Sequence, residues 1–169
     1  ADGRTSDIRR LGGRASGLDS LDFERTLLTT AIAAARRRSP AEADAPLHVA
    51  LSGALLADEA HMRAVAALTG SWPNLPALLV PSVPAALFAD AGAARAGLAA
   101  LQAAGFGFAA EINESAPGAM ATLFPPSVRF LKLPAHLLTD SRAMPDVLRA
   151  DWARTHPELR LIATDVADA

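Results

Sequence analysis

Cysteine is absent from the 169-residue chain, which excludes disulfides, zinc-thiolate sites, iron–sulfur clusters and thiol nucleophiles. An excess of positive charge is absent too. The formal net charge is −2, so no broad positive field exists to hold nucleic acid or an anionic membrane. Pro, Asp or Arg interrupts every apolar stretch well short of the roughly 20 residues that a membrane span needs. The first residues contain no apolar signal-peptide core, and we therefore expect a soluble, cytoplasmic chain.

Motifs typical of cofactor binding or hydrolysis are also absent. The chain contains no GxGxxG, no GxxxxGK[ST], no HExxH and no GxSxG. A metal site built on histidine needs several convergent donors, and no two histidines lie within one helical turn of each other. They are His48, His61, His136 and His156. The sequence thus predicts no metal, no cofactor and no catalytic residues of these classes, while a Ser/His/Asp triad formed only in space stays open.

The composition is that of an ordinary folded domain. Hydrophobic residues make up 51% and charged residues 20%, which excludes an intrinsically disordered chain. Residues 1–18 are polar and lack a clear period, and they predict an N-terminal arm or a first strand. Residues 19–169 predict a single α/β domain.

Strands and helices are expected to alternate along this domain. Apolar runs predict strands at residues 47–52, 77–80, 106–112, 128–133 and 159–163. Helices are predicted at residues 21–38, 55–68, 85–104 and 137–155, with a short helix or turn at 115–124. Such alternation is typical of parallel βα units, in a doubly wound sheet or in a (β/α) barrel. A barrel typically needs about 250 residues, so this one would be trimmed or incomplete.

Charged residues mark both ends of the first predicted helix. Asp22 and Glu24 fall in its first turn, where the helix dipole favours acids. The run from Arg36 to Arg38 falls in its last turn, where the dipole favours cations. We prefer this interpretation of the arginines to an anion-binding patch.

Charged residues also follow several predicted strands. In parallel α/β folds ligands bind at the carboxyl ends of the strands, where Glu111, Glu114, Lys132 and Asp165 fall. Glu111 and Lys132 stand at the ends of adjacent predicted strands and can form a polar site. A structural ion pair, or two solvated groups, is the favoured interpretation.

Four blocks of the chain resemble the EAL domain, the cyclic di-GMP phosphodiesterase family. Residues 105–138, GFGFAAEINESAPGAMATLFPPSVRFLKLPAHLL, are similar to the stretch that runs from "GF-x-hydrophobic-A-x-DDFGTG" to "hydrophobic-K-I-D". Residues 47–62 resemble the "VNLS" strand and the helix after it, and residues 75–82 stand where the family has "LEITES". Residues 158–169 are similar to "hydrophobic-IAEGVE". The resemblance covers about residues 21 to 169.

The resemblance implies a TIM-like (β/α) barrel of EAL type, trimmed or incomplete, with five to seven parallel strands alternating with helices. In active members the strand ends carry acidic and Asn ligands for two divalent metals, and such chemistry needs hard oxygen ligands. Here those positions fall on Ala50, near Pro81, and on Glu111, Ile112, Pro134 and Thr164, while the lysine is kept as Lys132. Glu111 and Lys132 would thus be the vestige of the family site. The "EAL" signature has no counterpart in residues 7–17, and we expect no phosphodiesterase activity.

Three functions stay open at this point. The leading hypothesis is a catalytically inactive EAL-like domain, a regulatory or scaffold module that binds a protein partner or a second copy in bacterial signalling or motility. The alternative is a receptor that binds cyclic di-GMP without cleaving it, disfavoured by the missing signature. The cations available to such a receptor are Arg9, Arg10, Arg14, Arg129 and Lys132. The third is an unrelated enzyme with Glu111 and Lys132 as an acid/base pair.

Overall fold

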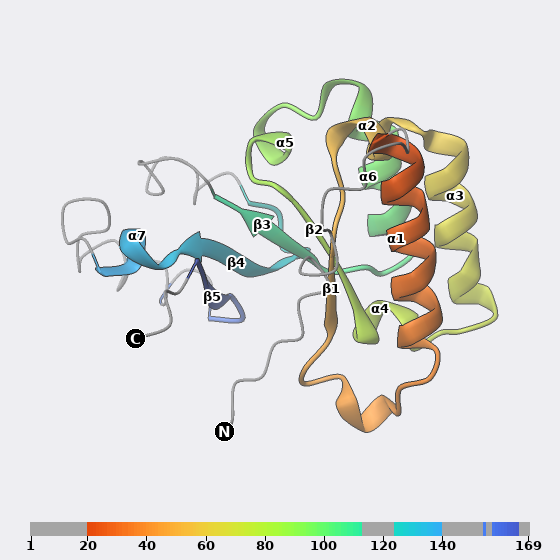
Figure 1. Cartoon of the computed structure of the whole chain (residues 1–169), viewed down its shortest axis with the longest axis horizontal. Helices are drawn as coiled ribbons and strands as arrows, with labels where there is room; N and C mark the ends of the chain where they lie inside the picture. Colours follow the sequence, from red (N-terminus) through yellow and green to blue (C-terminus); the bar gives the residue numbers. More distant parts are fainter. Residues whose placement is uncertain (1–19, 113–123, 140–153, 155–156, 166–169) are drawn as a thin grey trace.

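The computed structural model describes residues 20–112, 124–139, 154 and 157–165. Its centre is a five-stranded sheet in the order β1-β2-β3-β4-β5, and every neighbouring pair is parallel (Figure 1). The strands are β1 (Leu47–Ala50), β2 (Leu79–Pro84), β3 (Phe108–Glu111), β4 (Val128–Pro134) and β5 (Arg160–Thr164). The predicted α/β class with parallel strands is confirmed.

Among the described residues, helices precede β1, connect β1 to β2 and β2 to β3, and follow β4. They are α1 (Ser20–Ala35), α2 (Gly53–Ala57), α3 (Glu59–Ala67), α4 (Leu75–Leu78), α5 (Ala86–Ala89), α6 (Arg95–Ala103) and α7 (Ala135–Thr139). Short 3₁₀ turns are η2 (Pro40–Glu42), η3 (Leu68–Gly70) and η4 (Gly92–Ala94). Helices α1, α3 and α6 group on one side of the sheet (Figure 1).

The hydrophobic core lies between these helices and one face of the sheet. Alternate residues of the strands turn toward it, because successive side chains of a strand point to opposite faces. Among them are Val49, Val83, Phe108, Ala110 and Leu131, all buried. The helices contribute buried Leu28, Ile32, Met62 and Leu101 to the same cluster. This face of the sheet is therefore packed along β1 to β3 and much of β4, while β5 at its edge is mostly exposed.

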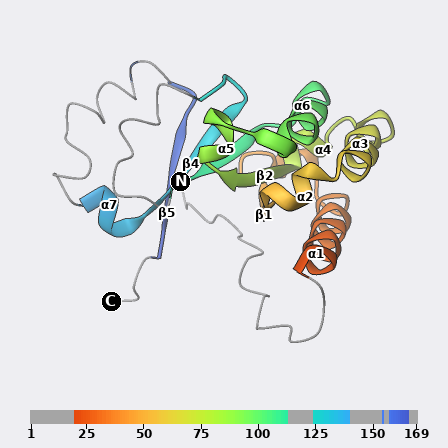
Figure 2. The same ribbon diagram turned by 90° about the horizontal axis from the view of Figure 1, so that it is seen from above.

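The other face of the sheet is concave. His48 in β1 and Phe130 in β4 are separated by two strands, yet their ring centroids lie 4.9 Å apart with the planes at 85°. In a flat sheet three strand spacings would hold them roughly 14 Å apart. The contact therefore requires the sheet to curl, and from above the strands follow an arc with the helices outside it (Figure 2). The five strands form a half-barrel.

Two predicted helices are split by residues that cannot continue them. Residues 55–68 lie in α2, α3 and η3, since Asp58 has a non-helical ψ of 79° and its side chain instead accepts a hydrogen bond from His61 N at 3.1 Å. Residues 85–104 are divided into α5, η4 and α6 by Asp90 and by Gly92, whose φ is +47°. Alanine-rich sequence hid both interruptions because alanine fits every part of a helix.

The first helix and the second strand also differ from expectation. Helix α1 ends at Ala35, so Arg36 to Arg38 follow the helix rather than form its last turn. The strand expected at residues 77–80 exists as β2, but its bounds and its closure at Pro81 are wrong. Its first residues belong to α4, and β2 continues through Pro81 to Pro84. Proline lacks only its own N–H donor, and the residue after it still pairs in the sheet, because Ser82 O accepts a hydrogen bond from Leu51 N at 2.8 Å.

Several expectations fall outside the described residues. They concern residues 1–18, nearly all of the segment 115–124, and most of the helix expected at 137–155, of which α7 is the described part. None of the described helices combines the length and the hydrophobicity that crossing a bilayer requires.

Candidate functional site

Among the described residues, the buried polar side chains gather on the concave face of the sheet. They are His48, Ser82, Glu111 and Lys132. The strand register places Ser82 beside Ala109, and Glu111 beside Pro84 and Lys132. These positions alternate with the residues of the hydrophobic core, so they face away from the helices. The half-barrel thus separates a packed outer face from an inner face that holds the buried charges.

Glu111 and Lys132 form a buried ion pair. Lys132 Nζ lies 3.6 Å from Glu111 Oε1, and the two side chains are only 4% and 8% exposed. The pairing follows from the register, which makes the two residues direct neighbours on β3 and β4. Each charge partly balances the other, and removing one would take a close charge partner from a side chain that stays buried.

A hollow of about 420 Å³ opens where β1, β2 and β3 end. The strand ends and the segment after β1 form one wall, and the amino-terminal half of α1 forms the other. The residues that line it are Ser20, Phe23, Glu24, Leu27, Ala50, Leu51, Ser52, Pro84 and Glu111. Glu24 and Glu111 are thus the charged groups of this lining.

Glu24 and Ser52 join the two walls of this hollow. Glu24 Oε2 accepts hydrogen bonds from Ser52 Oγ at 2.7 Å and from Ser52 N at 3.2 Å. Ser52 Oγ also accepts a hydrogen bond from Leu55 N at 3.1 Å and so caps α2. One hydroxyl therefore fixes both the start of α2 and the position of α1 above the strand ends.

Arg25, the next residue of α1, ties the same helix to the start of α3. Its guanidinium contacts Asp58 at 2.7 Å and Asp22 at 2.9 Å. The hydrogen bond from Arg25, followed by the one from His61 N, lowers the pKa of Asp58 below its usual value. The same contacts with Asp58 and Asp22 raise the pKa of Arg25. This end of α1 is thus fixed by side-chain hydrogen bonds as well as by apolar packing.

Comparison with solved structures matches the chain to the EAL enzyme Bd1971 in its cGMP-bound form, with a TM-score of 0.52 and 13% sequence identity. The match covers 88% of this chain and 40% of that one. The fold of the chain therefore matches part of the barrel of an EAL enzyme. It spans 40% of the length of that enzyme, and its five parallel strands correspond to part of the enzyme's TIM barrel. No protein-family model and no curated protein matches the sequence.

The described strand ends of this half-barrel carry few groups that ligate metals. Ala50 lines the hollow where the family resemblance assigns an asparagine. Ile112, assigned to the second aspartate, is buried in the hydrophobic core. Pro134 and Thr164 pair with each other at the ends of β4 and β5. Within the described ranges, no three His, Cys, Asp or Glu side chains are grouped closely enough to hold a metal ion.

The remaining candidates are not brought into this site. His48 is fully buried against Phe130. Arg129 is exposed, at the point where the β3–β4 register shifts. Asp165 is exposed with a φ of 54°, in the position that the "IAEGVE" block gives to glycine. Other candidates lie outside the described residues: Arg9, Arg10, Arg14, Glu114 and His156.

Sequence reasoning missed the link between Glu24 and Ser52. It placed Glu24 in a first turn for its effect on the helix dipole, whereas the structure uses its carboxylate to hold Ser52. The capping pattern of a serine before Gly53–Ala57 is a local signal that predicts part of this arrangement. The partner 28 residues away has no local signal.

Proposed function

We propose that this chain is a catalytically inactive EAL-like module that acts by binding a protein partner, in a regulatory or scaffold role. The proposal joins the EAL-type fold to the chemistry of the strand ends. A fold maintained without the ligands of its family reaction is most simply explained by use of its surface.

One observation carries the proposal. At the edge where an EAL enzyme would assemble two metals, the described strand ends offer the carboxylate of Glu111, and Lys132 pairs with it at 3.6 Å. Two-metal hydrolysis needs several hard oxygen ligands around each ion. Ala50, Pro134 and Thr164 supply no carboxylate ligand.

A receptor that binds cyclic di-GMP without cleaving it is the second candidate, and the hollow at the strand ends favours it by its volume of about 420 Å³. The charge of the residues that line the hollow opposes this candidate function. The charged residues of the lining are Glu24 and Glu111, while a dianionic dinucleotide needs arginine and backbone donors. We therefore place this candidate behind partner binding.

The test is titration of the purified chain with cyclic di-GMP, with and without Mg²⁺ or Mn²⁺, following both heat and nucleotide integrity. We expect neither turnover nor saturable heat. Turnover would overturn the proposal. Saturable binding without turnover would establish the receptor in its place.

A Glu111→Gln variant is the matched control for turnover. Hydrolysis that persists at the same rate in this variant comes from a contaminating enzyme rather than from the strand ends. Hydrolysis that disappears with Glu111 would instead show that the carboxylate takes part in catalysis, and it would contradict the proposal directly.

A further inference from the structure

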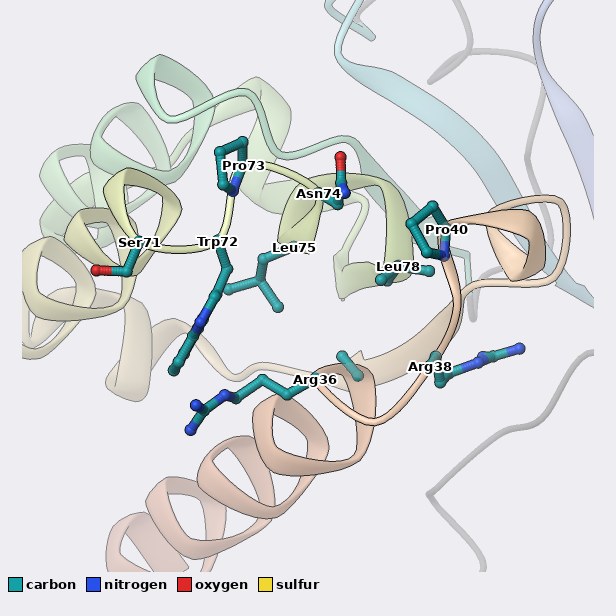
Figure 3. A pocket seen from close by; sticks show the side chains of 10 residues that line it. Arg36, Arg38, Pro40, Ser71, Trp72, Pro73, Asn74, Leu75 and Leu78 are labelled. Carbon is teal, nitrogen blue, oxygen red and sulfur yellow. The ribbon is translucent and has the colours of Figure 1, made fainter.

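A second hollow, of about 390 Å³, lies at the opposite edge of the sheet, before β1 and β2 begin. It is bounded by the end of α1 and by the segment that leads into α4 (Figure 3). Ala35, Leu75 and Leu78 line it and are buried, which gives it an apolar floor. Trp72 stands beside this floor as one wall.

Arg36 is held flat against Trp72 at the edge of this hollow. The guanidinium carbon lies 3.5 Å from the centroid of the indole ring. Both residues also line a neighbouring hollow of about 310 Å³ between α1 and α3, where Ile32, Val65 and Leu68 contribute apolar surface. The stacked pair thus stands between two hollows. Stacking leaves the N–H groups at the edge of a guanidinium free to bind a carboxylate.

The charge around the first hollow is positive. Its charged lining residues are Arg36 and Arg38, which extend in opposite directions, and Arg37 between them is exposed (Figure 3). Arg38 Nε pairs with Glu42 at 3.2 Å, and its Nη1 is buried with no hydrogen-bond partner within the described part of the chain. The chain as a whole carries a net charge of −2, so this corner differs in sign from the rest. A partner surface complementary in charge to this corner is therefore acidic.

We propose that this surface docks an acidic segment of a protein partner that also carries a large apolar side chain. The surface, called here the Arg36–Trp72 site, consists of Arg36, Arg37, Arg38, Trp72, Leu75 and Leu78. The apolar side chain of the partner enters the hollow above Leu75 and Leu78, and its carboxylates bind Arg36 and Arg37. Tryptophan and arginine in desolvated pockets are the residues that most often dominate binding energy. This inference rests on the proposed function, because it names the surface and the partner chemistry.

The experiment selects peptides from a random phage-displayed library against the full chain. We expect enriched peptides in which Asp or Glu flanks an apolar or aromatic residue. Arg36→Glu combined with Arg37→Glu should weaken their binding by about tenfold or more. Arg95→Glu, an exposed charge reversal on α6, is the matched control and should leave binding unchanged. Binding should also alter Trp72 fluorescence, measured with Trp152→Phe because the chain has two tryptophans.

Several results would overturn the Arg36–Trp72 site. These are a selection that enriches nothing, a consensus without acidic residues, equal affinity in the double variant, or displacement of the peptide by inorganic phosphate. Arg37→Glu alone, at an exposed position, gives the same comparison should the double variant fail to fold. Hydrolysis of cyclic di-GMP by the wild-type chain would overturn the proposed function instead. Selected peptides that bind the arginine variants as tightly as the wild type would overturn this site alone.

Discussion

Lys132 is the chain's lone lysine, and its ammonium lies against a carboxylate on the inner face of the half-barrel. Both side chains are almost fully buried, so their environment screens charge poorly. Such a pair adds little net stability compared with apolar residues of the same shape, but each partner depends on the other. Substitution of one of the two residues should therefore lower the stability of the fold more than substitution of both.

We predict that Lys132→Met alone destabilises the fold by about 3–5 kcal/mol, because it removes the ammonium that lies 3.6 Å from the buried carboxylate of Glu111. The double variant with Glu111→Leu should recover much of this loss. Urea unfolding of the wild type, of the Lys132→Met and Glu111→Leu single variants and of the double variant measures the difference. Equal stability of single and double variants would show that the two charges are not coupled.

Acid should weaken the attachment of α1 through Asp58. Hydrogen bonds from Arg25 and His61 N lower the pKa of Asp58 in the folded state, so its contribution is present above its unfolded pKa of about 3.9. The contribution is lost as the pH falls through the lower, folded pKa. We predict that Asp58→Asn reduces stability at neutral pH and flattens its decline in acid. Urea midpoints between neutral and strongly acidic pH test this, with Asp44→Asn as an exposed control.

At the scale of elements, the approach of α6 to α2 depends on a glycine. A Cβ at Gly97 would overlap the carbonyl oxygen of Leu56 and lie 2.9 Å from Met62 Cγ. The obstacle is backbone, which cannot rotate away as a side-chain tip can. Helices α2, α3 and α6 therefore meet closely only because residue 97 has no side chain.

We predict that Gly97→Ala destabilises the chain by about 1–3 kcal/mol or more, through forced separation of α2 and α6. Gly70→Ala is the matched control, since a Cβ there meets nothing within 4 Å and the backbone is not left-handed. That change should be neutral or slightly stabilising. Thermal unfolding compares the two, and similar melting temperatures would contradict the close approach.

Strands were easier to predict than helices in this chain. A short apolar run between breakers, such as the one around Phe108–Glu111, needs only local pattern to be identified. The helix boundaries at Asp58 and Gly92 were not predicted, because the surrounding sequence is rich in alanine. The end of the strand at Pro81 was predicted wrongly, because a strand can continue through a proline whose neighbours keep their hydrogen bonds. The meeting of Glu111 and Lys132 was expected from adjacent strands. The stacking of Arg36 on Trp72 depends on tertiary packing that no local pattern encodes.

Across the whole molecule, burial falls from one side of the half-barrel to the other. Strand β3 is buried along its full length, whereas β5 is mostly exposed and includes Leu161 at 46% exposure. The helices that cover the outer face, α1, α3 and α6, group near β1 and β2 (Figure 2). Resistance to local opening should follow the same gradient.

We predict that backbone amides of β2 and β3 exchange with solvent deuterium most slowly and those of β5 fastest. Buried strands open only with much of the core, while an exposed strand opens alone. Hydrogen exchange followed by mass spectrometry resolves the strands. Uniform protection across the sheet would contradict the gradient.

The strand order has a consequence for how the chain is made. Because each strand pairs with the one that follows it in sequence, no strand waits for a distant segment before it can join the sheet. Synthesis proceeds from the amino terminus at about 5–20 residues per second, so each described strand is made after the neighbour on which it docks. We therefore expect the five strands to join the half-barrel in the order of translation, one strand at a time, beginning with β1.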